Sequence, residues 1–207
     1  MEYCWLALAW IAWSALHSTM IDNRVTTALR RRLGASFRFY RLFFNLVSLV
    51  TLVPVVLYGR SLDSPVFWRV PDLLFVVQLL LLALALWLFV AGGRHYDFLQ
   101  FLGFRQISSG GSSGALTESG ALNTRGLLGV TRHPWYLGAL LFVWSYPREL
   151  TVAHLVVKGV LTVYIIVGTV FEEHKLVAEY GDAYRQYQRD VSMLLPWKLL
   201  GGKTRKY

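Results

Sequence analysis

The residues with the clearest chemical potential lie in two short stretches of the chain. Arg132-His133-Pro134-Trp135-Tyr136-Leu137-Gly138 places a guanidinium, an imidazole and a phenol at the start of one apolar run, and Glu172-Glu173 follows the end of the next apolar run. Ionisable groups are costly at membrane depth, so a cluster of them at the ends of apolar helices indicates a site. Leu137 to Phe171 is long enough for one helix out and one helix back, which returns Glu172 to the level of Arg132.

The elements that must position these groups are membrane helices. Of the 207 residues, 55% are hydrophobic and 15% are aromatic, which is too apolar for an ordinary soluble domain. Three windows are nearly free of charge and have the length of about 20 residues that crosses roughly 30 Å of hydrocarbon: Tyr3 to Ile21, Tyr40 to Gly59 and Asp72 to Gly92. Two further runs follow, Trp135 to Tyr146 and Glu149 to Phe171. The first of these two is short, so it is either a tilted or re-entrant half of a hairpin or a buried helix that does not span.

We therefore predict an all-α fold, a polytopic membrane helical bundle of about five transmembrane helices with a C-terminal interfacial helix. A single integral membrane domain covers residues 1–207. Residues 1–92 form its three-span N-terminal part, residues 93–131 a cytoplasmic loop with a Gly/Ser-rich linker, and residues 132–207 the part that carries the site. The linker lacks phosphate-binding spacing, so we interpret it as mobile or as a lid over the site.

The distribution of positive charge favours a membrane rather than a nucleic acid. The net charge is +9, and all of the 21 basic residues except Arg60, Arg69, Arg148 and Lys158 fall on alternate sides of successive expected spans, that is, on one face. The positive-inside rule places that face in the cytoplasm. We expect a multi-pass protein of the plasma or inner membrane, with its site facing the cytoplasm and its arginine run, residues 30–32, against anionic membrane lipids.

The C-terminal part carries one aromatic stripe. Tyr180, Tyr184, Tyr187 and Val191 fall at positions i, i+4, i+7 and i+11, which places them on one side of a helix. The stripe is either the buried face of a helix on the membrane surface or a wall of the pocket that contains Arg132, and the two interpretations are compatible.

Several other chemistries lack their motifs. The five histidines show no HxxxH or HExxH spacing that would bind zinc. The single cysteine, Cys4, excludes an intramolecular disulfide and a multi-thiolate metal centre. A Gly-x-Ser-x-Gly elbow is also missing, so acyl hydrolysis has no visible nucleophile. We therefore expect no metal, and a pocket that suits a charged, soluble cofactor and a lipophilic substrate.

Here the sequence resembles the integral-membrane methyltransferases that include isoprenylcysteine carboxyl methyltransferase and the phospholipid N-methyltransferases. The family motif Arg-His-Pro-x-Tyr-x-Gly corresponds to residues 132–138, and Glu-Glu-x-x-Leu corresponds to residues 172–176. Tyr/Phe-Gly-x-x-Tyr-x-x-Tyr corresponds to residues 180–187, and Pro196 matches a proline near the end. The resemblance is specific in this C-terminal part and covers the earlier residues only in kind, as helices.

The resemblance implies S-adenosylmethionine as the cofactor and a lipophilic or small thiol or carboxylate acceptor of the methyl group. It implies that the catalytic residues are Arg132, which would orient the acceptor or the cofactor carboxylate, and Glu173. The residues that it implies for cofactor binding are Gly126, His133, Pro134, Tyr136, Gly138, Glu172, Glu173, Tyr184 and Tyr187. Methyl transfer from a sulfonium needs alignment and desolvation more than it needs proton transfer.

Two alternatives remain. Membrane sterol reductases that use NADPH resemble the same pattern, but they carry Arg-His-Pro-Asn-Tyr-x-Gly-Glu, where this chain has Trp135 for the asparagine and Ala139 for the glutamate. The second alternative is a non-catalytic membrane protein like the denitrification-associated NnrU proteins, which have similar spans. The retained Arg132 and both glutamates favour catalysis. The sequence leaves the methyl acceptor and the oligomeric state open.

Overall fold

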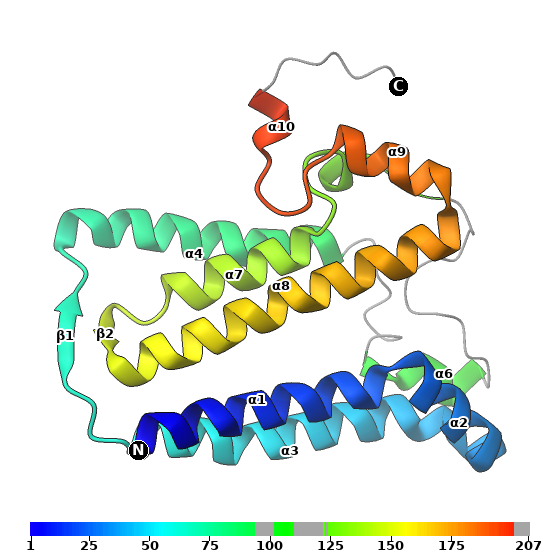
Figure 1. Ribbon diagram of the computed structural model, residues 1–207, viewed down its shortest axis with the longest axis horizontal. Helices are drawn as coiled ribbons and strands as arrows, with labels where there is room; N and C mark the ends of the chain where they lie inside the picture. The colour runs from blue at the N-terminus through cyan, green and yellow to red at the C-terminus, as the bar shows by residue number, and fades with distance from the viewer. Residues whose placement is uncertain (94–101, 110–121, 123, 201–207) are drawn as a thin grey trace. The chain divides into compact units, whose positions relative to one another are not determined.

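The structure is a computed structural model of the chain and describes residues 1–93, 102–109, 122 and 124–200. Figure 1 shows that these residues are almost entirely helical, which confirms the expected all-α fold class. Four segments have the length and apolarity to cross a membrane: Glu2–Ile21, Asn23–Ser61, Asp72–Gly93 and Val152–Tyr180. The chain is therefore an integral, multi-pass membrane protein. Most of the expected Gly/Ser-rich linker lies outside the described residues.

The chain divides into two compact units. The first unit contains Met1–Arg69, Tyr96–Glu118 and Glu149–Leu161, and the second contains Val70–His95, Ser119–Arg148 and Thr162–Tyr207. The long helix α8, Val152–Tyr180, begins in the first unit and continues into the second.

The first unit is built around a pair of long helices. Its elements are α1 (Glu2–Ile21), α2 (Asn23–Leu33), η1 (Gly34–Phe39), α3 (Tyr40–Ser61), α6 (Phe104–Ser109), the start of α8, and a small antiparallel sheet of β1 (Val66–Arg69) and β2 (Glu149–Thr151). Between α1 and α3, the indole of Trp13 donates to the Ser48 carbonyl at 3.1 Å, and the Nδ1 atom of His17 is hydrogen-bonded to the Ser48 hydroxyl at 3.1 Å. Polar groups thus join the two helices.

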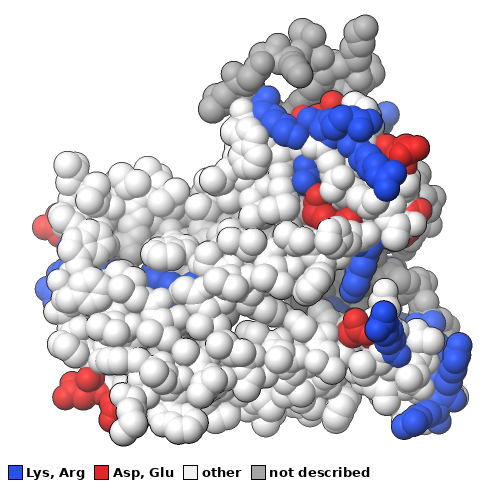
Figure 2. All heavy atoms as spheres, in the orientation of Figure 1, with Lys and Arg blue, Asp and Glu red and all other residues white. Residues whose placement is uncertain are grey.

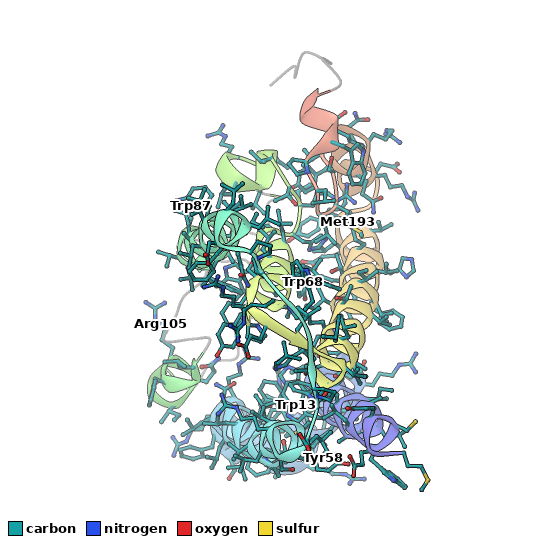
Figure 3. All side chains as sticks on the ribbon, turned by 90° about the vertical axis from the view of Figure 1, so that its left-hand side faces the viewer. Trp13, Tyr58, Trp68, Trp87, Arg105 and Met193 are labelled. Carbon is teal, nitrogen blue, oxygen red and sulfur yellow. The ribbon has the colours of Figure 1, made fainter. Side chains whose placement is uncertain are left out.

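The second unit holds the predicted site residues. Its elements are α4 (Asp72–Gly93), η2 (Gly126–Gly129), α7 (Pro134–Ser145), the rest of α8, α9 (Asp182–Asp190) and α10 (Trp197–Leu200). Helices α4 and α7 pack closely: a Cβ atom at Gly138 would lie 3.2 Å from the Ala85 carbonyl oxygen, and the Trp135 indole donates to the Phe89 carbonyl at 3.2 Å. Trp87, on α4, is 53% exposed and points outward in Figure 3, as a lipid-facing side chain would.

Helix α7 is the short apolar run of the sequence. Its 12 residues rise about 18 Å, which is less than the roughly 30 Å of hydrocarbon, so α7 does not span by itself. The described residues therefore contain four candidate spans, where we expected about five. Most apolar side chains of α4 are exposed, but its Gln78 is buried and donates to the carbonyls of Ser145 at 2.7 Å and Pro147 at 3.2 Å. Backbone groups at membrane depth need partners from protein, and Gln78 supplies one where α7 ends.

Charged side chains are concentrated on the short helices. Figure 2 shows a surface that is nearly free of charge along the middle of the long helices, with many of the basic and acidic side chains over α9 and α2 and further ones at the left-hand end of the view. The α2 arginines at positions 30, 31 and 32 are exposed. Both short helices thus have the polarity expected of segments at or outside the membrane boundary.

Candidate functional site

The stretch before α7 is paired with the C-terminal segment. His133 has φ −127° and ψ 69°, a non-helical conformation that the following proline favours. The amide of Arg132 donates to the Ser192 carbonyl at 3.0 Å, and the amide of His133 donates to the Met193 carbonyl at 3.2 Å. The Thr131 hydroxyl donates to the same Met193 carbonyl at 3.0 Å. Figure 1 shows this C-terminal turn, between α9 and α10, beside the loop that leads into α7.

The carboxylate of Glu173 is the centre of the site. It is buried on α8 and accepts five hydrogen bonds from four side chains, which with Glu173 we call the Glu173 cluster: Arg132, His133, Tyr184 and Gln188. Oε1 accepts from Arg132 Nε at 2.9 Å, from His133 Nε2 at 2.7 Å and from the Tyr184 hydroxyl at 2.6 Å. Oε2 accepts from Arg132 Nη2 and from Gln188 Nε2, each at 2.6 Å. A carboxylate offers about four lone-pair positions, so these donors fill it.

Arg132 also fixes the end of α9. Its Nη1 atom donates to the Gln188 carbonyl at 3.1 Å and to the Val191 carbonyl. Lys198 adds bonds from its Nζ atom to the carbonyls of Gln188 at 2.6 Å and Arg189 at 2.9 Å. The last carbonyls of a helix have no partner within the helix, so both cations satisfy groups that α9 leaves open. The guanidinium of Arg132 is thus bound to Glu173 on one side and to the C-terminal segment on the other.

The predicted aromatic stripe faces inward. Tyr184 and Val191 are each 1% exposed, and with Tyr187 they form a buried hydrophobic cluster to which Tyr180 also packs. The Tyr187 hydroxyl donates to the carbonyl of Leu128, in η2. Burial, followed by the hydrogen bond to Glu173, raises the pKa of the Tyr184 phenol above its ordinary range. This phenol therefore stays protonated and acts as a hydrogen-bond donor.

The two adjacent glutamates lie in different surroundings. The Glu172 side chain is 24% exposed, and its Oε2 atom lies 3.9 Å from His133 Nδ1. Because a carboxylate only accepts hydrogen bonds, the proton between His133 and Glu173 belongs to His133 Nε2. When the ring carries that proton alone, Nδ1 is an acceptor. Glu172 and Nδ1 therefore form a pair of neighbouring acceptors that suits a ligand with hydrogen-bond donors.

The remaining predicted residues shape the surroundings. The ring of Tyr136 lies 5.6 Å from the His133 ring, between centroids, and Pro134 is buried as the first residue of α7. Gly126 has φ +63°, which favours glycine, although no atom lies within 4 Å of the position of a Cβ. Gly138 allows the close approach of α4. Among the residues that the structure describes, no group of three His, Cys, Asp or Glu side chains could hold a metal ion.

The structure thus brings Arg132, His133, Glu173 and Tyr184 into direct contact, with Glu172 beside them. It adds Gln188 and Lys198, which the sequence reasoning missed. Gln188 lies four residues after Tyr184, so the helical periodicity that revealed the stripe also contained the signal for Gln188. Nothing in the sequence marked Lys198.

Comparison with known proteins adds a family and several relatives. The family described as NnrU protein matches residues 5–195. Methanethiol S-methyltransferase 1 of Bradyrhizobium diazoefficiens is 34% identical over 183 residues, which are 88% of this chain and 62% of that protein. Methanethiol S-methyltransferase of Pseudomonas deceptionensis is 47% identical over 77 residues, 37% of this chain and 29% of that protein.

A third relative extends the same pattern. Methanethiol S-methyltransferase of Mycobacterium tuberculosis is 39% identical over 101 residues, which are 49% of this chain and 41% of that protein. The chain therefore spans less than two thirds of the length of these relatives. No solved structure matches the chain.

Proposed function

Because the chain belongs to the NnrU protein family and has relatives named as methyltransferases, we propose that it is a membrane methyltransferase that uses S-adenosylmethionine. The observation that carries the proposal is the convergence of three separate stretches on Glu173: the start of α7, α8 itself and α9. These are the stretches that resemble the membrane methyltransferases in sequence. For the acceptor we propose a small thiol, since the relatives act on methanethiol by name, or another small lipophilic group.

The chemistry asks little of the protein beyond binding and alignment. When bound, S-adenosylmethionine supplies an electrophilic methyl group on sulfur. With the cofactor held by Glu172 and His133, a thiolate acceptor would take this methyl group, forming an S–C bond as the sulfonium S–C bond breaks, to give a methyl thioether and S-adenosylhomocysteine. The thiol proton goes to solvent. Holding the two reactants in line in a dry pocket supplies several kcal/mol of the barrier reduction, about the order of an orientation effect.

Glu172 and His133 are the residues we assign to the cofactor. The neighbouring acceptors, Glu172 Oε2 and His133 Nδ1, suit the hydroxyls of a ribose or the ammonium group of an amino acid, both of which S-adenosylmethionine carries. Tyr136 adds a ring beside the imidazole. These acceptors therefore fit the hydrogen-bond donors of the cofactor. Gly126, Pro134, Gly138 and the stripe tyrosines act by shaping the backbone and walls around these groups.

The arrangement in the membrane follows from charge and apolarity. We propose that the site opens to the cytoplasm, because the order of spans and charges in the sequence predicts the basic segments on the same side of the membrane as Arg132. The cofactor would then enter from water. A lipophilic acceptor would enter from the bilayer, whose lipids contact the apolar surface of the long helices.

Two measurements test the proposal. Detergent-purified protein is titrated by calorimetry with S-adenosylhomocysteine and, separately, with NADP. We expect binding of S-adenosylhomocysteine, and transfer of labelled methyl from S-adenosylmethionine to methanethiol. Binding of NADP alone would overturn the proposal in favour of the reductase. If neither compound bound and no methyl group were transferred, the proposal would be overturned in favour of a non-catalytic protein.

A matched pair of variants tests the cofactor contact. Glu172→Gln removes the charge of one acceptor and is expected to weaken S-adenosylhomocysteine binding by about tenfold, the loss of one charged hydrogen bond. Glu179→Gln is the control, because Glu179 is exposed on α8 two turns further along. Equal affinity in the two variants would remove Glu172 from the site.

A further inference from the structure

We infer that the hydrogen bonds to Glu173 hold the C-terminal segment, residues 182–198, against the start of α7. We call this set of contacts the clasp, and its positioning residues are Arg132, Tyr184, Gln188 and Lys198. Glu173 is then not a group that contacts the cofactor. The clasp itself stands on geometry alone, whereas its effect on cofactor binding rests on the proposed function.

The first step is that Glu173 has no capacity left for a ligand. Its side chain is 7% exposed, and its two oxygens already accept five hydrogen bonds. A cofactor could bind this carboxylate only by displacing a protein donor. Glu172, one residue earlier and 24% exposed, needs no such displacement.

The second step is the origin of the donors. Arg132 and His133 come from the stretch before α7, whereas Tyr184 and Gln188 come from α9. A buried carboxylate that accepts hydrogen bonds from several segments holds these segments together. If one donor moves away, the buried charge of the carboxylate loses part of its stabilisation. Arg132 strengthens the tie, since it binds Glu173 with two nitrogens and the α9 carbonyls with the third.

The third step is that backbone and apolar contacts act in the same direction. Arg132 and His133 pair through their amides with Ser192 and Met193, and Lys198 closes the end of α9. Figure 3 places Met193 on this C-terminal segment, beside the upper part of α8. The buried cluster of Tyr184, Tyr187 and Val191 lies behind the hydrogen bonds. The segment is therefore a packed element of the second unit.

The consequence for the site acts through His133. The clasp fixes its Nε2 atom on Glu173, so its Nδ1 atom is held 3.9 Å from Glu172. A cofactor that binds these two acceptors finds them in place and does not have to order them. A weakened clasp should therefore reduce cofactor affinity, while the maximal rate at saturating cofactor is kept, because binding restores the ordered state.

The test compares two glutamines of α9. Gln188→Ala removes one donor to Glu173. Gln186→Ala is the matched control, because within the described part of the chain the Gln186 side chain bonds only with Asp190 and Arg189, on the exposed side of α9. Trypsin cleaves after Arg185 and Arg189, and Arg185 is 58% exposed but lies within a helix that must open before cleavage. We expect Gln188→Ala to be cleaved there roughly tenfold faster than the wild type and Gln186→Ala, from the loss of one hydrogen bond to a charged group.

The KM for S-adenosylmethionine is the second measurement, because a smaller fraction of folded protein would lower the rate without changing the KM. Gln188→Ala should raise the KM for S-adenosylmethionine and the dissociation constant of S-adenosylhomocysteine by about tenfold, with kcat within about twofold of the wild type. Trypsin resistance equal to that of the wild type, or a lower kcat at unchanged KM, would overturn the clasp. Faster cleavage of Gln188→Ala in a protein that binds no S-adenosylhomocysteine would support the clasp and overturn the proposed function.

Discussion

Replacing Glu173 by glutamine is the sharpest single change that the structure offers. The substitution keeps the size of the side chain but exchanges one acceptor oxygen for an amide that donates. With the amide nitrogen at the Oε2 position, it meets Arg132 Nη2 and Gln188 Nε2, both of which also donate. With the amide reversed, it meets the three donors at Oε1. At least two of the five hydrogen bonds are lost in either orientation.

The expected loss of stability is large for an isosteric change. Glu173 and Arg132 have side chains that are each 7% exposed, so solvent does not replace the lost charge. Removing one partner of a buried ion pair costs about 3–5 kcal/mol. At about 1.4 kcal/mol per factor of ten, this raises the open fraction of the C-terminal segment by a hundredfold or more.

Glu172→Gln is the natural control, because it makes the same chemical change at the adjacent position. The Glu172 side chain is 24% exposed and forms no hydrogen bond with any residue that the structure describes. We therefore expect its free energy of unfolding to change by no more than about 0.5 kcal/mol. Unfolding temperature by tryptophan fluorescence in detergent, together with trypsin cleavage of α9, measures both variants. If Glu173→Gln unfolded at the wild-type temperature, or Glu172→Gln were the less stable variant, the assignment of Glu173 to the clasp would be refuted.

Three further predictions concern the surroundings of the site. Gly92→Ala should displace the indole of Trp135, because the new Cβ would lie 2.3 Å from its ring. In the control Gly93→Ala, the new Cβ would lie at an ordinary distance of 3.6 Å from the same ring. Tryptophan emission and unfolding temperature should therefore change only in Gly92→Ala. Gln78→Leu leaves the buried carbonyl of Ser145 and the partly buried carbonyl of Pro147 without this donor. The loss should cost about 1–3 kcal/mol and lower the unfolding temperature, and Gln78→Glu at neutral pH should not restore it. The pKa of Tyr184 is raised in the folded state, so its stabilising contribution is complete below the ordinary pKa of about 10 and is lost as pH rises further. Between pH 9 and pH 11, Tyr184→Phe should therefore lose less unfolding temperature than the wild type. An equal change of unfolding temperature with pH in the two proteins would contradict the buried phenol.

The fold was predictable where length and apolarity decide it. The windows at α1, α3, α4 and α8 were found from charge-free runs of spanning length, because hydrocarbon leaves few alternatives to a helix. The outcome at α7 was not predictable in this way. Its residues are as apolar as those of a span, but the helix ends at Ser145. There the side chain of Gln78, on α4, donates a hydrogen bond to the Ser145 carbonyl, which the helix leaves without a partner. That pairing depends on contact between two helices far apart in the sequence.

The candidate site was predictable as a set of residues and not as a set of contacts. Spacing alone returned Glu172-Glu173 to the level of Arg132, and the helical period placed Tyr184 and Tyr187 on one side of α9. The resemblance to membrane methyltransferases then assigned these residues to a cofactor, and their roles stay proposals. The helical period that placed Tyr184 on this side of α9 also places Gln188 there, but nothing in the sequence marks Lys198, since a lone lysine near a helix end is usually exposed to water.

The sequence by itself determined that this chain crosses the membrane several times and that its cations, rings and paired acids meet at one level, because hydrophobic length and helical rise are local properties. Only the tertiary structure decided which of the two acids is enclosed. Neighbouring residues on a helix point about 100° apart, so the two acids face different surroundings. The return of the C-terminal segment makes Glu173 the enclosed residue and leaves Glu172 open to a ligand.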